Sequence, residues 1–261
     1  MTGRPAAPRD WDAASYDRVS APQADWAAAV LDRLPLAGDE TVLDAGCGSG
    51  RVTRLLAERL PHGRVIAVDG APSMVALTRE AFAGDERVEV LDAVDLVELE
   101  LDQHVDAVFS NAVFHWVPDH RRLFARLHAL LRPGGRLAAQ CGGQGNIDRF
   151  DEAAREVARR EPYAEHFADW RSPWNFRGAE ETRRSLREAG FEQVGCDVEQ
   201  RRVTSGQPLE FVTTVCLGHH LEVLPGGLRE RFARAVVEAC GAPLVLDYRR
   251  LNIAATRPSR A

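Results

Sequence analysis

The chain has 261 residues, which is enough for one large α/β domain or for one domain with a small cap. Apolar residues make up 45% of it, so a sizeable core can be buried and a disordered chain is not expected. The net charge of -6 argues against the overall basic surface of a nucleic-acid-binding protein, and the arginine pairs are scattered among acids, which is typical of solvated faces.

The cysteines are Cys47, Cys141, Cys196, Cys216 and Cys240. Their odd number and the lack of any CxxC spacing argue against a disulfide framework and against a zinc site. The N-terminus has no apolar core of a signal peptide, and no run approaches the ~20 apolar residues of a membrane span. We therefore expect a soluble cytoplasmic protein with reduced thiols, no metal and no membrane partner.

Apolar periodicity predicts a helix from Trp11 to Leu34, which Pro35 and Gly38 end. Strands and helices then alternate. The expected strands are 41–44, 65–69, 88–91, 105–110 and 136–140, and the expected helices are 51–60, 72–82 and 120–131. The strands are continuous apolar runs, which is typical of a mostly parallel sheet covered on both faces.

After this alternation the pattern changes. Residues 144–190 are polar, helical and rich in aromatic side chains, which indicates an inserted cap. Strand character returns at 191–203, helical character follows at 207–240 with a break at Pro225-Gly226-Gly227, and a last strand is expected at 248–255.

The stretch VLDAGCGSG, Val42 to Gly50, ends the first strand and places glycine at positions 46, 48 and 50. Glycine permits a positive φ and a close approach of the backbone, and the free N–H groups of the next helix point into this loop. In an open parallel sheet, ligands bind beyond the carboxyl ends of the strands. The dinucleotide fingerprint G-x-G-x-x-G is not matched, because Arg51 stands at its last glycine, so an NAD-dependent enzyme is not expected. A tight turn without a ligand stays the alternative.

Acids follow the next two strands. Asp69 is well placed to accept hydrogen bonds from both hydroxyls of a ribose, or it caps the helix that starts near Pro72. Asp92 is placed to meet an adenine amino group, or it is an ordinary turn residue. With Asp44, three consecutive strands end in an acid.

Five motifs resemble those of the class I S-adenosylmethionine-dependent methyltransferases, in the same order and over about residues 40 to 140. They are Val42 to Gly50, Val65 to Gly70, Asp92-Ala93, Ser110-Asn111-Ala112 and Leu131 to Leu137. The resemblance implies a Rossmann-like, seven-stranded, mostly parallel sheet with an antiparallel last hairpin and helices on both faces. It divides the chain into an N-terminal helical lid (1–38), the cofactor-binding core (39–142), a helical cap insertion (143–190) and the C-terminal part of the core sheet with an inserted helical segment (191–261).

The same resemblance implies the cofactor S-adenosylmethionine and its contacts. The loop Gly46 to Gly50 would hold the methionine moiety, Asp69 the ribose and Asp92 the adenine ring. Asp44 would fix the turn and add negative potential near the sulfonium. The further residues that we expect to bind the cofactor are Cys47, Gly48, Gly70, Met74, Ala93, Asn111, Ala112 and Tyr16.

The segment from Ser110 to His120 is similar to the corresponding segment of trans-aconitate methyltransferases and juvenile-hormone-acid methyltransferases, which methylate carboxylates. A carboxylate is already ionised at pH 7 and needs no general base, whereas a hydroxyl or carbon acceptor usually needs one. His115 is the nearest candidate base, and a packing histidine is the alternative. Trp116 is a candidate wall of the acceptor pocket.

Other residues are candidates for the acceptor site. Gln23 comes from the N-terminal helices, Arg171 and Arg177 would clamp a carboxylate or pack on neighbouring aromatic rings, and His219 lies in the late helical region. We expect a monomeric or homodimeric enzyme that O-methylates a carboxylate of a small molecule. The alternatives are O-, N- or C-methylation of a natural product with His115 as the base, and a regulatory protein that binds the cofactor without chemistry.

Overall fold

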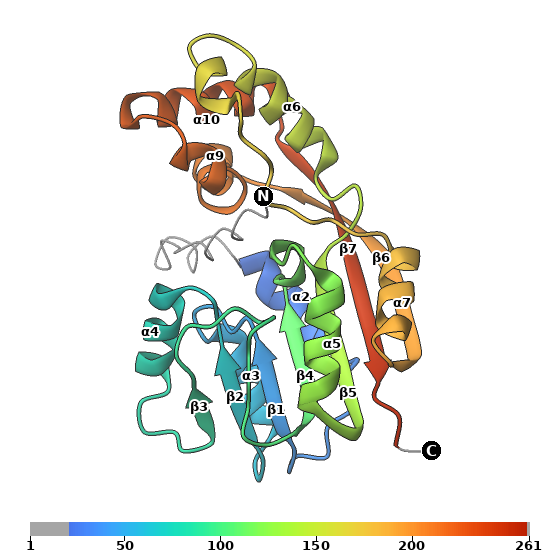
Figure 1. Cartoon of the computed structure of the whole chain (residues 1–261). Helices are drawn as coiled ribbons and strands as arrows, with labels where there is room; N and C mark the ends of the chain where they lie inside the picture. The colour runs from blue at the N-terminus through green and yellow to red at the C-terminus, as the bar shows by residue number, and fades with distance from the viewer. Residues whose placement is uncertain (1–20, 260–261) are drawn as a thin grey trace.

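The computed structural model describes residues 21–259, with side chains from Trp26 onward (Figure 1). The described strands form one seven-stranded sheet in the order β3-β2-β1-β4-β5-β7-β6. Strand β7 runs antiparallel to β5 and β6, and the other pairs are parallel. The strands are β1 (Thr41–Ala45), β2 (Arg64–Val68), β3 (Val88–Val90), β4 (Val105–Asn111), β5 (Leu131–Gly142), β6 (Glu192–Thr204) and β7 (Val245–Thr256). The expected Rossmann-like architecture with an antiparallel last hairpin is therefore confirmed.

The helices fall into two groups, those that cover the sheet and those that lie beyond its carboxyl edge. The covering helices are α2 (Ala21–Leu31), α3 (Arg51–Arg59), α4 (Pro72–Ala81), α5 (His120–Leu130) and α7 (Ala179–Glu188). The others are α6 (Asp148–Ala158), α8 (Pro208–Phe211), α9 (Gly218–Glu222) and α10 (Gly226–Cys240), with the short turns η1 (Phe114–Trp116) and η2 (Ala164–Phe167) and the π-helical η3 (Val212–Cys216).

Each face of the sheet carries its own apolar core. Leu127 of α5 and Leu186 of α7 pack on one face with Leu251 of β7. Val30 of α2 and Leu56 of α3 pack on the other. All five side chains are essentially buried, at 0–1% exposure, which explains why the sequence shows unbroken apolar strands.

A second unit lies beyond the carboxyl ends of the parallel strands, where α6, α9 and α10 stand above the sheet (Figure 1). We call α6, η2 and α8 to α10 the cap. Its core joins Phe150 and Val157 of α6 to Phe232 of α10, and it takes in Leu246 and Tyr248 of β7. The cap is thus assembled from two separate stretches of chain around the extended end of the β6–β7 hairpin.

The packing of α7 differs from the expected cap. Residues 143–190 were expected to form one insertion, yet α7 packs on β6 and α5, with Leu186 in the core of the sheet. Conversely, α8 to α10, from the region after 191, pack with α6. The physical reason is amphipathicity: α7 has one apolar stripe, and the open face beside α5 and β6 buries it.

Element ends also differ in places. Strand β5 begins at Leu131 rather than Arg136, because Leu131 pairs with Val105 ahead of a bulge. Strand β7 begins at Val245 rather than Tyr248, and the break before α10 lies between Glu222 and Gly226. Within residues 21–259, no helix is both long and apolar enough to cross a lipid bilayer.

Candidate functional site

The turn that follows β1 holds three glycines in the left-handed region. The φ angles are 93° at Gly46, 57° at Gly48 and 83° at Gly50. The N–H groups of Gly46 and Cys47 both donate to the carbonyl of Val68, over 2.8 and 2.9 Å. These bonds anchor the turn to the end of β2, so its conformation does not depend on a ligand.

The two sides of this turn differ. A side-chain carbon added at Gly46 would collide with Val113, so that side is closed. A carbon added at Gly48 would meet no atom of the described residues within 4 Å, although Thr78 holds the carbonyl of Gly48 with a 2.8 Å hydrogen bond. The main chain at Gly48 is therefore held on one side by Thr78, and no side chain in the described part of the chain covers it on the other. A ligand can approach the main chain closely only where it is uncovered in this way.

Asp69, directly after β2, connects the two turns. Its Oδ2 accepts from the N–H of Gly48 at 3.0 Å, and its Oδ1 accepts from the N–H of Ala71 at 2.9 Å. Burial raises the pKa of Asp69, and these backbone N–H groups oppose the rise. Each carboxylate oxygen accepts more than one hydrogen bond, so both retain capacity for hydroxyl donors.

Asp44 lies beneath the turn and is 1% exposed. Its Oδ2 accepts a 2.7 Å hydrogen bond from the hydroxyl of Thr53, which ties β1 to α3. Burial raises the pKa of Asp44 to about 7, the Thr53 bond opposes the rise, and the charge of Asp69 adds to it. Near neutral pH a cation bound close to Asp44 would therefore favour its ionised form.

The other residues expected to contact the cofactor lie around this edge. Cys47 is buried with its sulfur 3.7 Å from the hydroxyl of Thr78, and burial raises the pKa of its thiol. Met74 is buried on α4. Ala93 is exposed, and the side chain of Asp92 is 95% exposed and pairs with Arg79 at 2.7 Å. Tyr16 and the side chain of Gln23 lie outside the described residues.

The end of β4 faces the glycine turn across the switch in strand order between β1 and β4. Ala112 has a φ of 62°, and its N–H donates to the carbonyl of Gln140 at 2.7 Å. The Oδ1 of Asn111 is buried and accepts no hydrogen bond from any described residue. A buried orphan acceptor is costly, so its position indicates a donor supplied by a ligand or by another part of the chain.

His115 lies on η1 and is 8% exposed. The backbone N–H of Gly142 donates to its Nδ1 at 3.2 Å. A backbone N–H can only donate, so Nδ1 carries no proton and the neutral ring holds its proton on Nε2. Burial lowers the pKa of His115 well below its ordinary value, and the nearby charges of Arg250 and His120 lower it further.

Aromatic rings from distant segments meet beside His115. The ring centroid of Trp116 lies 5.2 Å from that of His219 in α9 and 6.1 Å from that of Trp174. The ring of His115 lies 5.7 Å from that of Phe176, which stacks on Trp174. The structure thus brings together three of the predicted acceptor-site residues, His115, Trp116 and His219.

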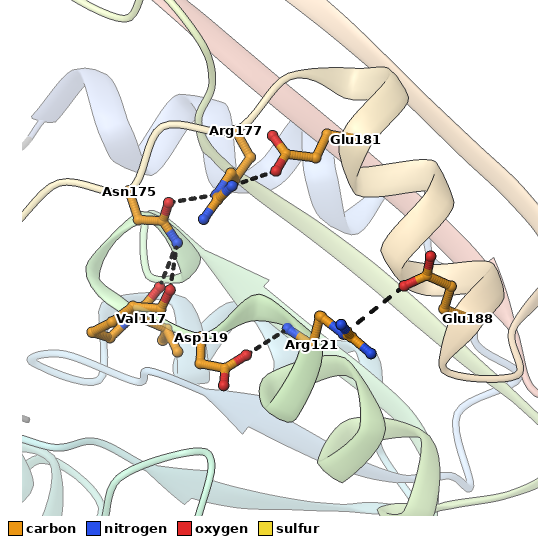
Figure 2. Close-up of polar contacts among 8 residues, drawn as sticks. Val117, Asp119, Arg121, Asn175, Arg177, Glu181 and Glu188 are labelled. Atoms are coloured by element: carbon orange, nitrogen blue, oxygen red, sulfur yellow. Dashed lines mark hydrogen bonds and ion pairs between the residues drawn. The ribbon is translucent and has the colours of Figure 1, made fainter. Parts of the chain in front are cut away.

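The two arginines expected to clamp a carboxylate are engaged elsewhere. Arg177 forms an ion pair with Glu181, and its Nε donates to Oδ1 of Asn175 at 2.6 Å (Figure 2). Asn175 in turn donates to the carbonyl of Val117 at 2.9 Å. Arg171 is exposed and donates to the carbonyl of Trp170 at 3.1 Å. The bonds of Asn175 fasten this stretch to the segment between η1 and α5. Both guanidinium groups have partners within residues 170–181, and the carboxylate clamp stays a prediction.

Sequence reasoning missed a polar row on β5 and β7. Arg250 of β7 is 3% exposed, and its Nε donates to Oε1 of Gln140 at 3.0 Å. Gln140 donates to Oδ1 of Asn252 at 2.7 Å, and the guanidinium carbon of Arg250 lies 5.1 Å from the ring centroid of Trp26. The available signal was in β7, where Arg250 and Asn252 are polar residues two apart and therefore on the same face of the strand.

This edge of the sheet fits S-adenosylmethionine. The bare main chain at Gly48 suits an amino-acid tail, and the carboxylate of Asp69 suits ribose hydroxyls. The orphan Oδ1 of Asn111 suits an ammonium group, and the buried carboxyl of Asp44 suits a positive charge nearby.

Comparisons with known proteins agree with this architecture. Residues 43–139 match the family model described as a methyltransferase domain. Trans-aconitate 2-methyltransferase of Methylobacterium nodulans is 36% identical over 151 residues, which cover 58% of this chain and 55% of that protein. The enzyme of the same name from Variovorax paradoxus is 37% identical over 156 residues, which cover 60% of this chain and 59% of that protein. The match thus spans less than two thirds of these relatives.

Solved structures match over more of the chain. Phosphoethanolamine N-methyltransferase 2 of Haemonchus contortus, in complex with S-adenosylhomocysteine and phosphomonomethylethanolamine, has a TM-score of 0.62 at 18% identity over 94% of this chain and 57% of that one. The YcgJ protein of Bacillus subtilis has a TM-score of 0.65 at 15% identity over 89% of this chain and 97% of that one. At these identities the likeness concerns the fold.

Proposed function

We propose that this chain, whose residues 43–139 match a methyltransferase domain, is a class I, S-adenosylmethionine-dependent enzyme that methylates a carboxylate oxygen of a small molecule. The observation that carries the cofactor assignment is the glycine turn, fixed by β2 yet bare at Gly48, with the carboxylate of Asp69 bound to its N–H.

S-adenosylmethionine supplies an already activated methyl group when it is bound. The protein's contribution is to bind, orient and exclude water. The turn from Gly46 to Gly50, Asp69 and Asn111 are proposed to hold the cofactor. The rings of Trp116, Trp174 and Phe176 would wall the acceptor, because they lie next to His115 beyond the end of β4.

The state of His115 favours a carboxylate acceptor. Its Nδ1 lone pair already accepts from Gly142, and the remaining ring nitrogen carries a proton, so the ring is a donor and not a base. A carboxylate reaches the site as an anion and needs no base. The relatives named trans-aconitate 2-methyltransferase support the same substrate class.

The experiment is turnover of S-adenosylmethionine against a panel of small mono-, di- and tricarboxylates that includes trans-aconitate, together with phenols and amines. We expect product with one added CH₂ from an acid, released as the free acid by mild alkaline hydrolysis, as an ester requires. Methylation of phenols or amines alone would overturn the carboxylate assignment and return His115 to the role of base. Cofactor binding without turnover on any acceptor would support a regulatory protein instead.

Cofactor binding has its own test, which does not depend on the acceptor. Asp69→Ala should weaken S-adenosylmethionine by about 10²-fold, because it removes a charged acceptor of ribose hydroxyls and a bond to the glycine turn. Asp85→Ala, at a half-buried carboxylate paired with Arg87, is the matched control and should bind normally. Unchanged affinity in folded Asp69→Ala protein would contradict the assignment of the cofactor site.

A further inference from the structure

Strands β4, β5 and β7 place polar side chains on one face of the sheet, near the carboxyl edge of its parallel strands. Asn111 of β4 pairs in register with Gln140 of β5, and Gln140 pairs with Asn252 of β7. Paired residues share a face, and so do residues two apart along a strand, so Arg250 lies on the same face as Gln140. The polar row therefore runs from Asn111, at the proposed methionine end of the cofactor site, to Arg250.

Neighbouring side chains fix the position of Arg250 within this row. Its Nε donates to Gln140, and Gln140 is held by Asn252, whose Nδ2 donates to Asp197 at 2.9 Å. The guanidinium also lies over the ring of Trp26. Burying a charged side chain is energetically costly, and this network also restricts the rotation of the side chains that form it. The guanidinium of Arg250 is therefore held in one position, as expected of a preorganised binding group.

Gly142 marks where Arg250 meets the proposed acceptor site. It pairs with Arg250 in register, and its N–H holds the ring of His115. A side-chain carbon at Gly142 would come within 2.5 Å of the ring of Phe176, so the ring occupies the space that the glycine leaves. Burial lowers the pKa of His115, and the positive charge of Arg250 lowers it further. Arg250, His115 and Phe176 thus converge on one glycine.

We propose that Arg250 is the specificity-determining residue of the acceptor site, where it binds a carboxylate of the acceptor, and that Gln140 is its positioning residue. The inference rests on the proposed function and deepens it: acceptors are small organic acids, and those with a second carboxylate besides the methylated one are favoured. A guanidinium recognises a carboxylate with charge-assisted and often bidentate hydrogen bonds.

Variants of Arg250 provide the first test. In Arg250→Met we expect KM for the best acid of the panel to rise by about 10²-fold or more, with a smaller change in kcat and an unchanged dissociation constant for S-adenosylmethionine. Arg249→Met is the matched control, since Arg249 is the exposed neighbour on the opposite face of the same strand. It should keep the KM of the wild type. Equal KM values for Arg250→Met and Arg249→Met would overturn the proposal.

Gln140→Glu keeps Arg250 in place and tests its charge. The new carboxylate would still accept from Nε of Arg250, although it cannot donate to Oδ1 of Asn252 as the Gln140 amide does. It would compete with the acid, so KM should rise by at least tenfold in protein that remains folded. A merely structural role for Arg250 predicts an unchanged KM, and that result would overturn the inference even if Arg250→Met failed to fold.

The result also separates this inference from the proposed function. If the wild type methylates an acid, and Arg250→Met and Gln140→Glu methylate it with the KM of the wild type, only the proposed role of Arg250 is wrong. If the wild type methylates no acid, the proposed function is wrong, and calorimetric titration of trans-aconitate into protein loaded with S-adenosylhomocysteine decides the inference. Binding that Arg250→Met loses would support it, and absence of binding to the wild type would overturn it.

Discussion

The backbone N–H of Gly142 donates a 3.2 Å hydrogen bond to Nδ1 of His115, and this contact separates two kinds of methyl transfer. A general base needs a lone pair that faces the acceptor. His115 has its lone pair on Gly142 and its proton on Nε2, and both burial and the charge of Arg250 keep the ring neutral.

His115→Ala is therefore expected to retain kcat within about tenfold of the wild type, whereas loss of a general base costs about 10²-fold or more. The pKa of His115 lies well below 6.5, so the ring does not titrate in the neutral range, and kcat of the wild type should be flat from about pH 6 to pH 9. Steady-state kinetics on the acid acceptor checks both. A large loss in a folded variant, or a kcat that rises with pH across that range, would favour the base.

Alanine substitutions at Gly48 and Gly84 distinguish the effect of backbone strain from the effect of contact with a ligand. Both have a positive φ, 57° and 90°, and an added side-chain carbon meets no described atom within 4 Å at either position. Alanine at each should cost about 1–2 kcal/mol of stability through strain. Only Gly48→Ala should also weaken S-adenosylmethionine, by tenfold or more, since the methyl group would stand where the ligand approaches the main chain. Calorimetry on both variants tests this, and equal affinities would refute the bare-turn model.

Asp44 should make cofactor affinity depend on pH. Its pKa is raised to about 7 by burial, so the carboxyl is mostly protonated at pH 6 and ionised at pH 8.5. A sulfonium close by favours the ionised form, and binding releases the proton. Affinity for S-adenosylmethionine is expected to fall about tenfold from pH 8 to pH 6. Asp44→Asn accepts the same Thr53 hydrogen bond and should flatten this dependence; an identical pH profile in the variant would exclude Asp44 as the titrating group.

His220 predicts acid sensitivity of the cap. It is 1% exposed, neither ring nitrogen has a hydrogen-bond partner among residues 21–259, and the ring of Trp170 lies 4.4 Å away. Burial lowers the pKa of His220 to about 4, with smaller contributions from the charges of His219 and Arg155. The unfolded chain binds the proton more readily, so stability is present above pH 6.5 and is lost as the pH falls towards 4.

The size of this effect follows from the two pKa values. A folded-state pKa of about 4 against the ordinary 6.5 corresponds to about 3 kcal/mol of the free energy of unfolding. Asp44 acts with the opposite sign, since its raised pKa means that stability is lost as the pH rises through about 7. The free energy of unfolding should therefore be measured by denaturant titration at pH 7.5 and pH 4.5, for the wild type and for His220→Phe. The change between the two pH values is then compared between the two proteins. The variant should lose less stability on acidification, and a parallel loss would contradict the prediction.

The sequence by itself determined the architecture and the edge of the sheet at which the cofactor is proposed to bind. Apolar runs such as Val65 to Val68 must be buried on both faces, which requires a parallel sheet, and the carboxyl ends of neighbouring parallel strands meet at one edge. The glycines at 46, 48 and 50 and the acid at Asp69 are local to their strands, so their mutual placement follows once the strands pair. These features depend on interactions over short stretches of chain.

The acceptor side was decided by tertiary structure. Arg177 is a plausible clamp from its aromatic neighbours, yet Glu181, one helical turn further on, takes its charge. Arg250 belongs to no sequence motif. It lies beside the proposed acceptor site only because β7 runs antiparallel between β5 and β6 and pairs it with Gly142. The tautomer of His115 likewise depends on a donor from another strand. Periodicity reports which face of an element is apolar, and it carries no information on which distant strand will supply the partner of a buried polar group.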